Sequence, residues 1–353
     1  MKILFYLGHP AHFHLFKHAI NHFKNNAVVV IKSKDILQKL LNENNVPFIN
    51  VEEINSKHNA GGKFLLAFRI LKRIFGIQRI IRNTKPDLLA GSPAELALAG
   101  KITGVPVCMF FEDDINKVAP YGSLTGPFAF RMVCPDVCNA GRWSDKKVGY
   151  NSYHELAYLH PNHFTPDKSK VAGYFKEGEK NFIIRFVELG AFHDAGKKGI
   201  TNEFAGAIIK KLSPFGKIHI TSERALPKEF EPFRIHISPS DIHHALYFSD
   251  MFIGDSQTMT AEAAVLGTPA LRFNDFVGEL SYLEDLEHRH ELTFGFKTNN
   301  AEGLLEKLDE LIQTPELKQT WKIRKEKMLL EKTDLAKWMI NFFENFPVSD
   351  KTY

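Results

Sequence analysis

The stretch that most constrains the fold is residues 251–273, MFIGDSQTMTAEAAVLGTPALRF. Residues 251–253 form a short apolar run typical of a buried strand, and Gly254-Asp255-Ser256 interrupts it. Good helix formers fill residues 259–266, and Gly267-Thr268-Pro269 ends them before a second strand at residues 269–273. The order strand, turn, helix, strand predicts an α/β domain with a parallel sheet.

The turn in this stretch brings polar side chains to the N-terminus of the helix. A helix N-terminus carries partial positive charge and free N–H donors, which suit a phosphate or pyrophosphate. Glu262 lies about one turn further in, where a carboxylate accepts hydrogen bonds from ribose hydroxyls. The alternative is that Asp255 and Ser256 only cap the helix and that Glu262 is a surface residue. The predicted nucleotide-binding residues of this segment are Gly254, Asp255, Ser256, Gln257, Thr258, Met259 and Glu262.

The motif DS-x5-E-A-x2-LGTP-x-LR, which begins at Asp255, resembles the donor-site segment of UDP-N-acetylglucosamine 2-epimerases. It is also similar to the corresponding segment of the lipid-linked muramyl-peptide N-acetylglucosaminyltransferase. Both groups have the two-domain GT-B architecture. Gln257 and Thr258 stand where the epimerases have a glycine pair. The resemblance implies nucleotide-sugar binding and leaves the reaction open.

Three segments together resemble a family of predicted bacterial and archaeal glycosyltransferases catalogued as a domain of unknown function. They are HFHLFK from His12, residues 150–161, and residues 258–269. The resemblance covers roughly residues 1–310, and the chain departs from it at Ser256-Gln257, where two glycines are usual, and at His154, where lysine is usual. Residues that keep the family pattern are His12, His14, Lys17, Tyr150, Glu155, Tyr158, Leu159, Thr258, Met259, Glu262 and Gly267.

The first part of the chain alternates short apolar runs with helical patterns. Strands are predicted at residues 3–7, 28–31, 46–51, 86–90 and 105–111. This alternation predicts a parallel sheet with right-handed crossovers, whose ligands gather beyond the carboxyl ends of the strands.

A histidine-rich loop, with His9, His12 and His14, follows the first strand, and a helix is predicted from Leu15 to Phe23. The histidines fit a metal cluster, a general base that titrates near neutral pH, or packing, capping and solvated roles.

Two other strand ends of this region carry polar residues. Gly91-Ser92-Pro93 follows the fourth strand, and Glu112-Asp113-Asp114 follows the fifth. The acidic run fits a base or a metal site, and it equally fits a capping cluster. The catalytic candidates are His12, His14 and Asp113, and the acceptor-side candidates are His9, Ser92, Tyr150 and Glu155.

The second half of the chain begins after a stretch rich in Pro, Asn, Asp and Lys, around residues 161–170. Its first strand, residues 181–187, carries Arg185 near the carboxyl end, where it neutralises a donor phosphate or pairs with Glu188 or Asp194. Further strands are predicted at residues 217–221 and 234–237.

The GT-B resemblance implies two Rossmann-like domains with parallel sheets facing across a cleft. The predicted domains are residues 1–165, the acceptor side, and residues 166–332, which bind the nucleotide-sugar. Residues 333–353 are predicted to form a C-terminal helix that packs back on the first domain through Trp338, Phe342 and Phe343.

Residues 63–82, KFLLAFRILKRIFGIQRIIR, are the most amphipathic stretch. An ordinary helix that covers a sheet explains this pattern, with its basic face in solvent. The alternative is docking on an anionic membrane surface, where each cation contributes about 1 kcal/mol. The predicted apolar side consists of Ala67, Ile70, Leu71, Ile74, Ile77 and Ile81.

Composition limits the classes of protein to which the chain can belong. The chain has 353 residues, enough for two α/β domains, and its net charge of +4 does not indicate a nucleic-acid partner. The start of the chain shows no signal-peptide pattern and no apolar run approaches the ~20 residues of a membrane span, so we expect a cytoplasmic protein. Three cysteines make no disulfide framework, and no second pair completes a zinc site with Cys134 and Cys138, so we expect no metal.

These patterns together predict a GT-B glycosyltransferase. It moves a sugar from a nucleotide diphosphate-sugar, with UDP favoured, to an unidentified glycan or lipid-linked acceptor, such as a surface polysaccharide. The donor is a substrate, and no cofactor is expected, because the helix dipole and Arg185 stabilise the leaving diphosphate. One alternative is an epimerase-like enzyme, although the G-T-R-P-E start and the H-x-E-A-G-L-R segment of epimerases are absent. Another is a nucleotide-sugar-binding protein without catalysis.

Overall fold

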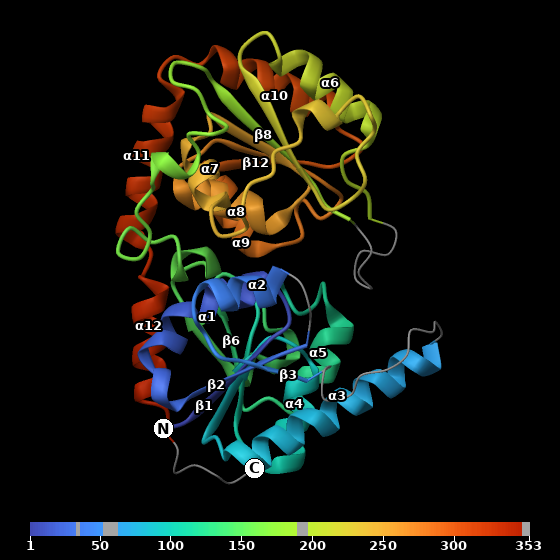
Figure 1. Cartoon of the computed structure of the whole chain (residues 1–353), viewed down its shortest axis with the longest axis vertical. Coiled ribbons are helices and arrows are strands. Elements are labelled where there is room, and N and C mark those ends of the chain that lie inside the picture. The colour runs from blue at the N-terminus through green and yellow to red at the C-terminus, as the bar shows by residue number, and fades with distance from the viewer. Residues whose placement is uncertain (33–35, 52–62, 189–196, 348–353) are drawn as a thin grey trace. The chain divides into compact units, whose positions relative to one another are not determined.

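The computed structural model describes residues 1–32, 36–51, 63–188 and 197–347. The chain divides into two compact units, drawn in Figure 1. The first consists of Met1–Tyr158 together with the chain from Thr333 onward, and the second is Leu159–Lys332. The first division therefore falls at Tyr158, a few residues before the predicted position 165, and residues 159–165 belong to the second unit.

The first unit is built on a parallel sheet with strand order β3-β2-β1-β4-β5-β6-β7. Its direction of winding reverses between β1 and β4, which defines a topological switch point at their carboxyl ends. The strands are β1 (Ile3–Leu7), β2 (Ala27–Ile31), β3 (Ile49–Asn50), β4 (Leu88–Gly91), β5 (Val107–Phe110), β6 (Arg131–Pro135) and β7 (Lys147–Tyr150).

Helices from both ends of the chain cover this sheet. Phe343 of the last helix packs edge-on against Phe5 of β1, and Ser152 donates a hydrogen bond to the carbonyl of Thr333 just before that helix. The prediction that the C-terminal helix returns to the first domain is therefore confirmed. The helices are α1 (Pro10–His22), α2 (Ile36–Glu43), α3 (Lys63–Thr84), α4 (Glu95–Thr103), α5 (Ala119–Thr125) and α12 (Leu335–Glu344).

The second unit is a smaller parallel sheet with strand order β12-β11-β10-β8-β9 and a switch point between β8 and β10. Its strands are β8 (Asn181–Phe186), β9 (Lys217–Ser222), β10 (Met251–Gly254), β11 (Ala270–Phe273) and β12 (Thr293–Phe296). Its helices are α6 (Asn202–Leu212), α7 (Ile242–Phe248), α8 (Gln257–Leu266), α9 (Ser281–Glu284), α10 (Ala301–Gln313) and α11 (Leu317–Glu331).

Two local predictions were wrong. Helix α1 begins at Pro10, because proline fits the first helical position and His9 caps it by accepting a hydrogen bond from the amide of Ala11. His12 and His14 thus belong to a helix, not to a loop. Residues 234–237 form no strand: only Arg234 makes a single bridge, to Ile220.

In helix α3 only part of the predicted apolar side is buried. Ile74, Ile77 and Ile81 are buried as expected, but Ile70 and Leu71 are 36% and 50% exposed. The reason is that the first turns of α3 extend beyond the body of the unit (Figure 1). The side chain of Ala67 lies outside the described residues.

Candidate functional site

The switch point of the second unit brings the two parts of the predicted donor site together. Gly254, the last residue of β10, pairs with Arg185 of β8, and helix α8 begins at Gln257. A Cβ on Gly254 would lie 3.0 Å from the Cβ of Arg185, so glycine permits this close approach. Arg185 therefore lies beside the turn that leads into α8.

Ser256 is the N-cap of α8. Its side chain accepts a hydrogen bond from the amide of Met259 at 3.2 Å, which satisfies one donor of the first turn. Gln257 and Thr258 occupy the first two helical positions and are half-buried. The capping role of Ser256 is thus present, and it is compatible with an anion at the amides before Met259.

Asp255 has a structural role in this arrangement. One carboxylate oxygen accepts a hydrogen bond from the amide of Val187 at 2.8 Å, and the other from the amide of Ile200 at 3.2 Å. Burial raises the pKa of Asp255 to about 6, while these amide hydrogen bonds oppose the shift. We therefore assign Asp255 to positioning the chain after β8 rather than to contact with a nucleotide.

Glu262 is not a surface residue. It is buried, and its Oε1 atom lies 3.0 Å from Nε2 of His243 on α7. Thr258 lies one turn earlier on the same face of α8. Because its carboxylate pairs with a buried imidazole, Glu262 also contributes to the stability of the unit.

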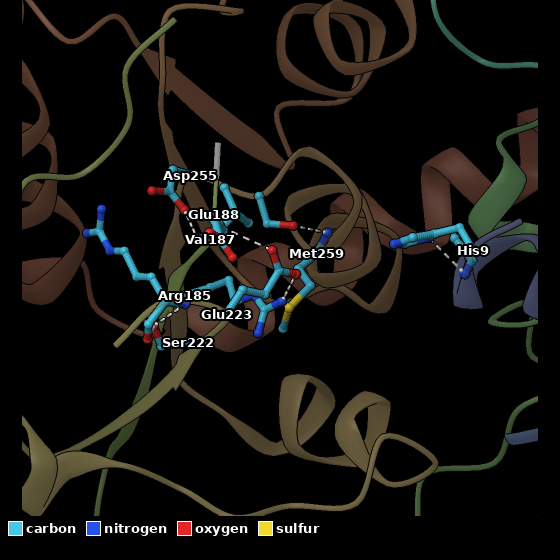
Figure 2. A network of polar contacts seen from close by, with 11 residues as sticks. His9, Arg185, Val187, Glu188, Ser222, Glu223, Asp255 and Met259 are labelled. Carbon is cyan, nitrogen blue, oxygen red and sulfur yellow. Dashed lines mark hydrogen bonds and ion pairs between the residues drawn. The ribbon is translucent and has the colours of Figure 1, made fainter. Parts of the chain in front are cut away.

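Arg185 forms an ion pair that the sequence did not identify. Its Nη2 atom donates to Oε1 of Glu223, and the amide of Glu188 donates to Oε2 of the same carboxylate at 3.2 Å. Figure 2 shows this network with Ser222, Val187 and Asp255. Glu188 thus contributes its amide to the network, and Asp194, the other predicted partner, lies outside the described residues.

The three histidines at the start of the first unit have different roles. His9 caps α1, and the ring of His14 packs against Tyr158 with 5.0 Å between ring centres. His12 Nδ1 accepts a hydrogen bond from the amide of Gly8 at 3.1 Å. Burial, aided by the charges of His9, His154 and Lys32, lowers the pKa of His12 to about 3. Because Nδ1 already accepts this hydrogen bond and the ring resists protonation, His12 is a weak proton acceptor, which weighs against its predicted role as general base.

A second group of titratable residues lies where β5 and β7 end. The amide of His154 donates to Oε1 of Glu112 at 2.9 Å, and Nδ1 of His154 lies 3.6 Å from Oε2. Burial raises the pKa of Glu112 well above its usual range, and the charges of Glu155 and Asp113 add to that effect. Asp113 is half-buried and adjoins Glu112 in the chain.

The predicted acceptor-side residues lie on the same edge of the sheet. Ser92 follows β4, and its carbonyl accepts a hydrogen bond from the hydroxyl of Tyr121. Tyr150, at the end of β7, and Glu155 are both buried. Their side chains belong to the interior of the unit in this structure, and their contact with an acceptor stays a prediction.

Metal-binding geometry is not found in the part of the chain that the structure describes: no group of three or more His, Cys, Asp or Glu residues is arranged to hold an ion there. Cys134 and Cys138 are buried free thiols.

A hollow of about 830 Å³ occurs in the second unit, lined by residues that include Lys168, Asn181 and Asp250. It lies where β8 and β10 begin, which is the opposite edge from the switch point.

Three solved structures show the class of fold. UDP-GlcNAc 2-epimerase from Neisseria meningitidis, bound to UDP-GlcNAc, is 14% identical with a TM-score of 0.67, over 98% of this chain and 100% of that one. HepE from Anabaena, in complex with UDP and glucose, is 14% identical with a TM-score of 0.66 over the same shares. MurG from Acinetobacter baumannii is 13% identical with a TM-score of 0.59, again over 98% and 100%.

The protein thus has the fold of GT-B proteins, with two Rossmann-like α/β domains, as predicted. Its sequence matches, over residues 1–280, the family described as "Protein of unknown function (DUF354)", and the chain belongs to that family. The suspected membership of this family is confirmed, and the epimerase and MurG structures share the fold, as the resemblance implied. Among curated proteins, none matches the chain significantly.

Several polar residues at the carboxyl edges of the two sheets were not among the predicted site residues. They are His154, Glu223 and His243, together with Glu112, which the sequence showed only as part of an acidic run. His154 contacts Glu112, which lies 42 positions earlier in the chain. Glu223 contacts Arg185, which lies 38 positions earlier. No motif in the sequence connects these pairs.

Proposed function

We propose that the protein is a glycosyltransferase that takes a sugar from a nucleotide diphosphate-sugar, with UDP as the favoured nucleotide. The observation that carries this proposal is the convergence of Arg185, the amides at the start of α8 and Glu262 at the carboxyl edge between β8 and β10. Cationic and N–H donors there suit a diphosphate, and a carboxylate one turn into the helix suits ribose hydroxyls. Two similar structures hold UDP-GlcNAc and UDP with glucose, which supports this proposal.

The first unit supplies the acid–base group in this account. For an inverting reaction, the acceptor hydroxyl gives its proton to a base as its oxygen attacks the anomeric carbon, and the nucleoside diphosphate leaves. Glu112 is the best candidate: its raised pKa means that its carboxylate, once ionised, is a stronger base than an exposed one, and Asp113 beside it is the second candidate. His14 remains a weaker candidate, since its ring packs against Tyr158.

A second function is an epimerase-like reaction on the same donor. The observation that supports it is that one of the similar structures is an epimerase bound to UDP-GlcNAc. The two reactions use the same nucleotide-sugar and differ in their product. A third reading, a nucleotide-sugar-binding protein without catalysis, predicts binding and no product.

Product analysis separates these functions. The protein is incubated with radiolabelled UDP-N-acetylglucosamine, with and without cell extract as a source of acceptor. Transfer of label to an extract component supports the glycosyltransferase, and an epimer or free sugar formed without extract supports the epimerase. Tight binding with neither product supports the non-catalytic protein, and absence of binding to a panel of nucleotide-sugars contradicts all three.

We further propose that α3 brings the enzyme to an anionic membrane surface, where a lipid-linked acceptor would lie. Ile70, Leu71 and Phe75 are exposed, and Phe75 is 65% exposed. Arg69, Lys72, Arg79 and Arg82 are exposed on the same helix. Apolar side chains flanked by cations are typical of a helix that lies in a membrane interface. Within the described residues, no helix is long and apolar enough to cross a membrane.

A further inference from the structure

Two donors of the second unit converge on one carboxylate. The guanidinium of Arg185 donates from Nη2 to Oε1 of Glu223, and the backbone amide of Glu188 donates to Oε2 at 3.2 Å (Figure 2). A guanidinium and a backbone amide that face the same point are the donor types that bind phosphate oxygens in proteins. The carboxylate of Glu223 therefore stands where an external anion fits.

The donors are held more firmly than the carboxylate. The Arg185 side chain is 18% exposed, and its Cβ lies against Gly254 of the neighbouring strand. Its Nε atom is buried and has no hydrogen-bond partner among the residues that the structure describes. The Glu223 side chain is 46% exposed and follows the end of β9. Because half-exposed ion pairs contribute little to stability, Glu223 leaves its position at low cost.

The amide of Glu188 is positioned by its neighbour. The preceding amide, that of Val187, donates to Oδ1 of Asp255 at 2.8 Å. Asp255 thus fixes the chain where it leaves β8, and the next amide is directed to the carboxylate of Glu223. The same Asp255 lies directly before Ser256, the N-cap of α8. The anion position and the start of α8 are therefore connected through one buried side chain.

We propose that Glu223 occupies the anion site of the empty second unit, and that a phosphate of the donor displaces it to bind Arg185 and the amide of Glu188. This inference rests on the proposed function for the identity of the anion. Glu223 then acts as an internal competitor that lowers affinity for the nucleotide and speeds its release. Since the carboxylate and the phosphate carry the same sign of charge, they cannot occupy the site together.

Calorimetric titration of the full chain with UDP, and separately with inorganic pyrophosphate, tests this competition. The variant Glu223→Gln keeps the size of the side chain and removes its charge. It should bind both ligands about 3–10-fold more tightly than the parent protein. Arg185→Gln should bind them at least about 10-fold more weakly, and Glu223→Gln should give no gain in the Arg185→Gln background, because the competitor acts through that arginine.

The matched control is Glu231→Gln. Glu231 pairs with Arg234 in the same unit, and its side chain has the same exposed fraction of 46%, but it lies away from the switch point. The control should leave both affinities unchanged. Thermal unfolding of every variant shows whether the protein is folded under the conditions of the titration.

The outcomes separate this inference from the proposed function. If the parent binds UDP and Glu223→Gln binds it equally or more weakly, the competition is contradicted while the donor site stands. If UDP does not bind but Glu223→Gln tightens pyrophosphate binding, the anion site is supported and the nucleotide assignment fails. If neither ligand binds to the parent or to Glu223→Gln, both are contradicted.

Discussion

The carboxyl edges of the two sheets differ in the charge state of their side chains. In the first unit, burial lowers the pKa of His12 and of His154 to about 3 and raises the pKa of Glu112, so these groups favour their neutral forms. In the second unit, Arg185 and Glu223 are a charged pair. We therefore expect the first edge to serve proton transfer and the second to hold an anion, as proposed above.

The largest expected effect concerns proton transfer at the first edge. Replacing Glu112 by Gln should reduce kcat about 10²–10⁴-fold, because an amide cannot accept the acceptor's proton. Asp113→Asn removes a charge that raises the pKa of Glu112, so the rising limb of the pH–rate profile should move to lower pH. Steady-state sugar transfer measured across pH tests both. Full activity of Glu112→Gln with loss of activity in Asp113→Asn would transfer the role of base to Asp113.

The next effect concerns acid stability. An unfolded histidine takes up a proton near pH 6.5, whereas buried His12 and His154 resist protonation until about pH 3. The free energy of unfolding should therefore fall steadily as pH drops from about 6.5 toward 3. Urea unfolding at several pH values measures this loss. His12→Asn should reduce the slope, whereas replacing the exposed His22 by Asn serves as the control and should not.

A smaller effect is expected at Glu262. Replacing it by Gln keeps a hydrogen-bonding group beside His243 and should weaken UDP-sugar binding by roughly 1.5–3 kcal/mol. Glu262→Ala should in addition destabilise the empty protein, because it leaves a buried imidazole without this partner. Calorimetry and thermal unfolding separate the two losses. Unchanged affinity of Glu262→Gln would remove this residue from the donor site.

The smallest effect concerns the surface of α3. Arg69→Gln and Arg79→Gln should each weaken binding to anionic vesicles by about 1 kcal/mol, and high salt should do the same. Phe75→Ser should weaken binding to a similar degree in any salt, because its contribution is apolar. Equal partition of the parent protein onto neutral and anionic vesicles would restore the alternative of a sheet-covering helix.

Much of the fold was predictable because its signals are local. The alternation of apolar runs with helical patterns identified both parallel sheets, and the aromatic face with Trp338, Phe342 and Phe343 identified α12. The strands that were missed, β6, β7 and β12, are four or five residues long. β7 and β12 also contain glycine, which weakens a strand pattern. The start of α1 was misplaced because Pro10 was read as part of a loop, although proline suits a first helical position.

The candidate site was predictable only where it is continuous in sequence. The segment from Gly254 to Glu262 is one strand end, one turn and one helix, so its geometry follows from local rules. The pairings of Arg185 with Glu223 and of Glu262 with His243 depend on which strands and helices become neighbours. For the same reason, the sequence did not show that the oxygens of Asp255 are occupied by backbone amides.

Hydrogen exchange of the full chain, with and without saturating UDP, tests the central claim most directly. The account predicts slower exchange in the second unit at the amides of residues 254–262 and at Glu188. Exchange at the first-unit edge, around residues 8–14 and 110–114, should change less, because that edge is assigned to the acceptor. Protection confined to the first unit, or no protection at the start of α8 under conditions where UDP is bound, would contradict the assignment of the donor site.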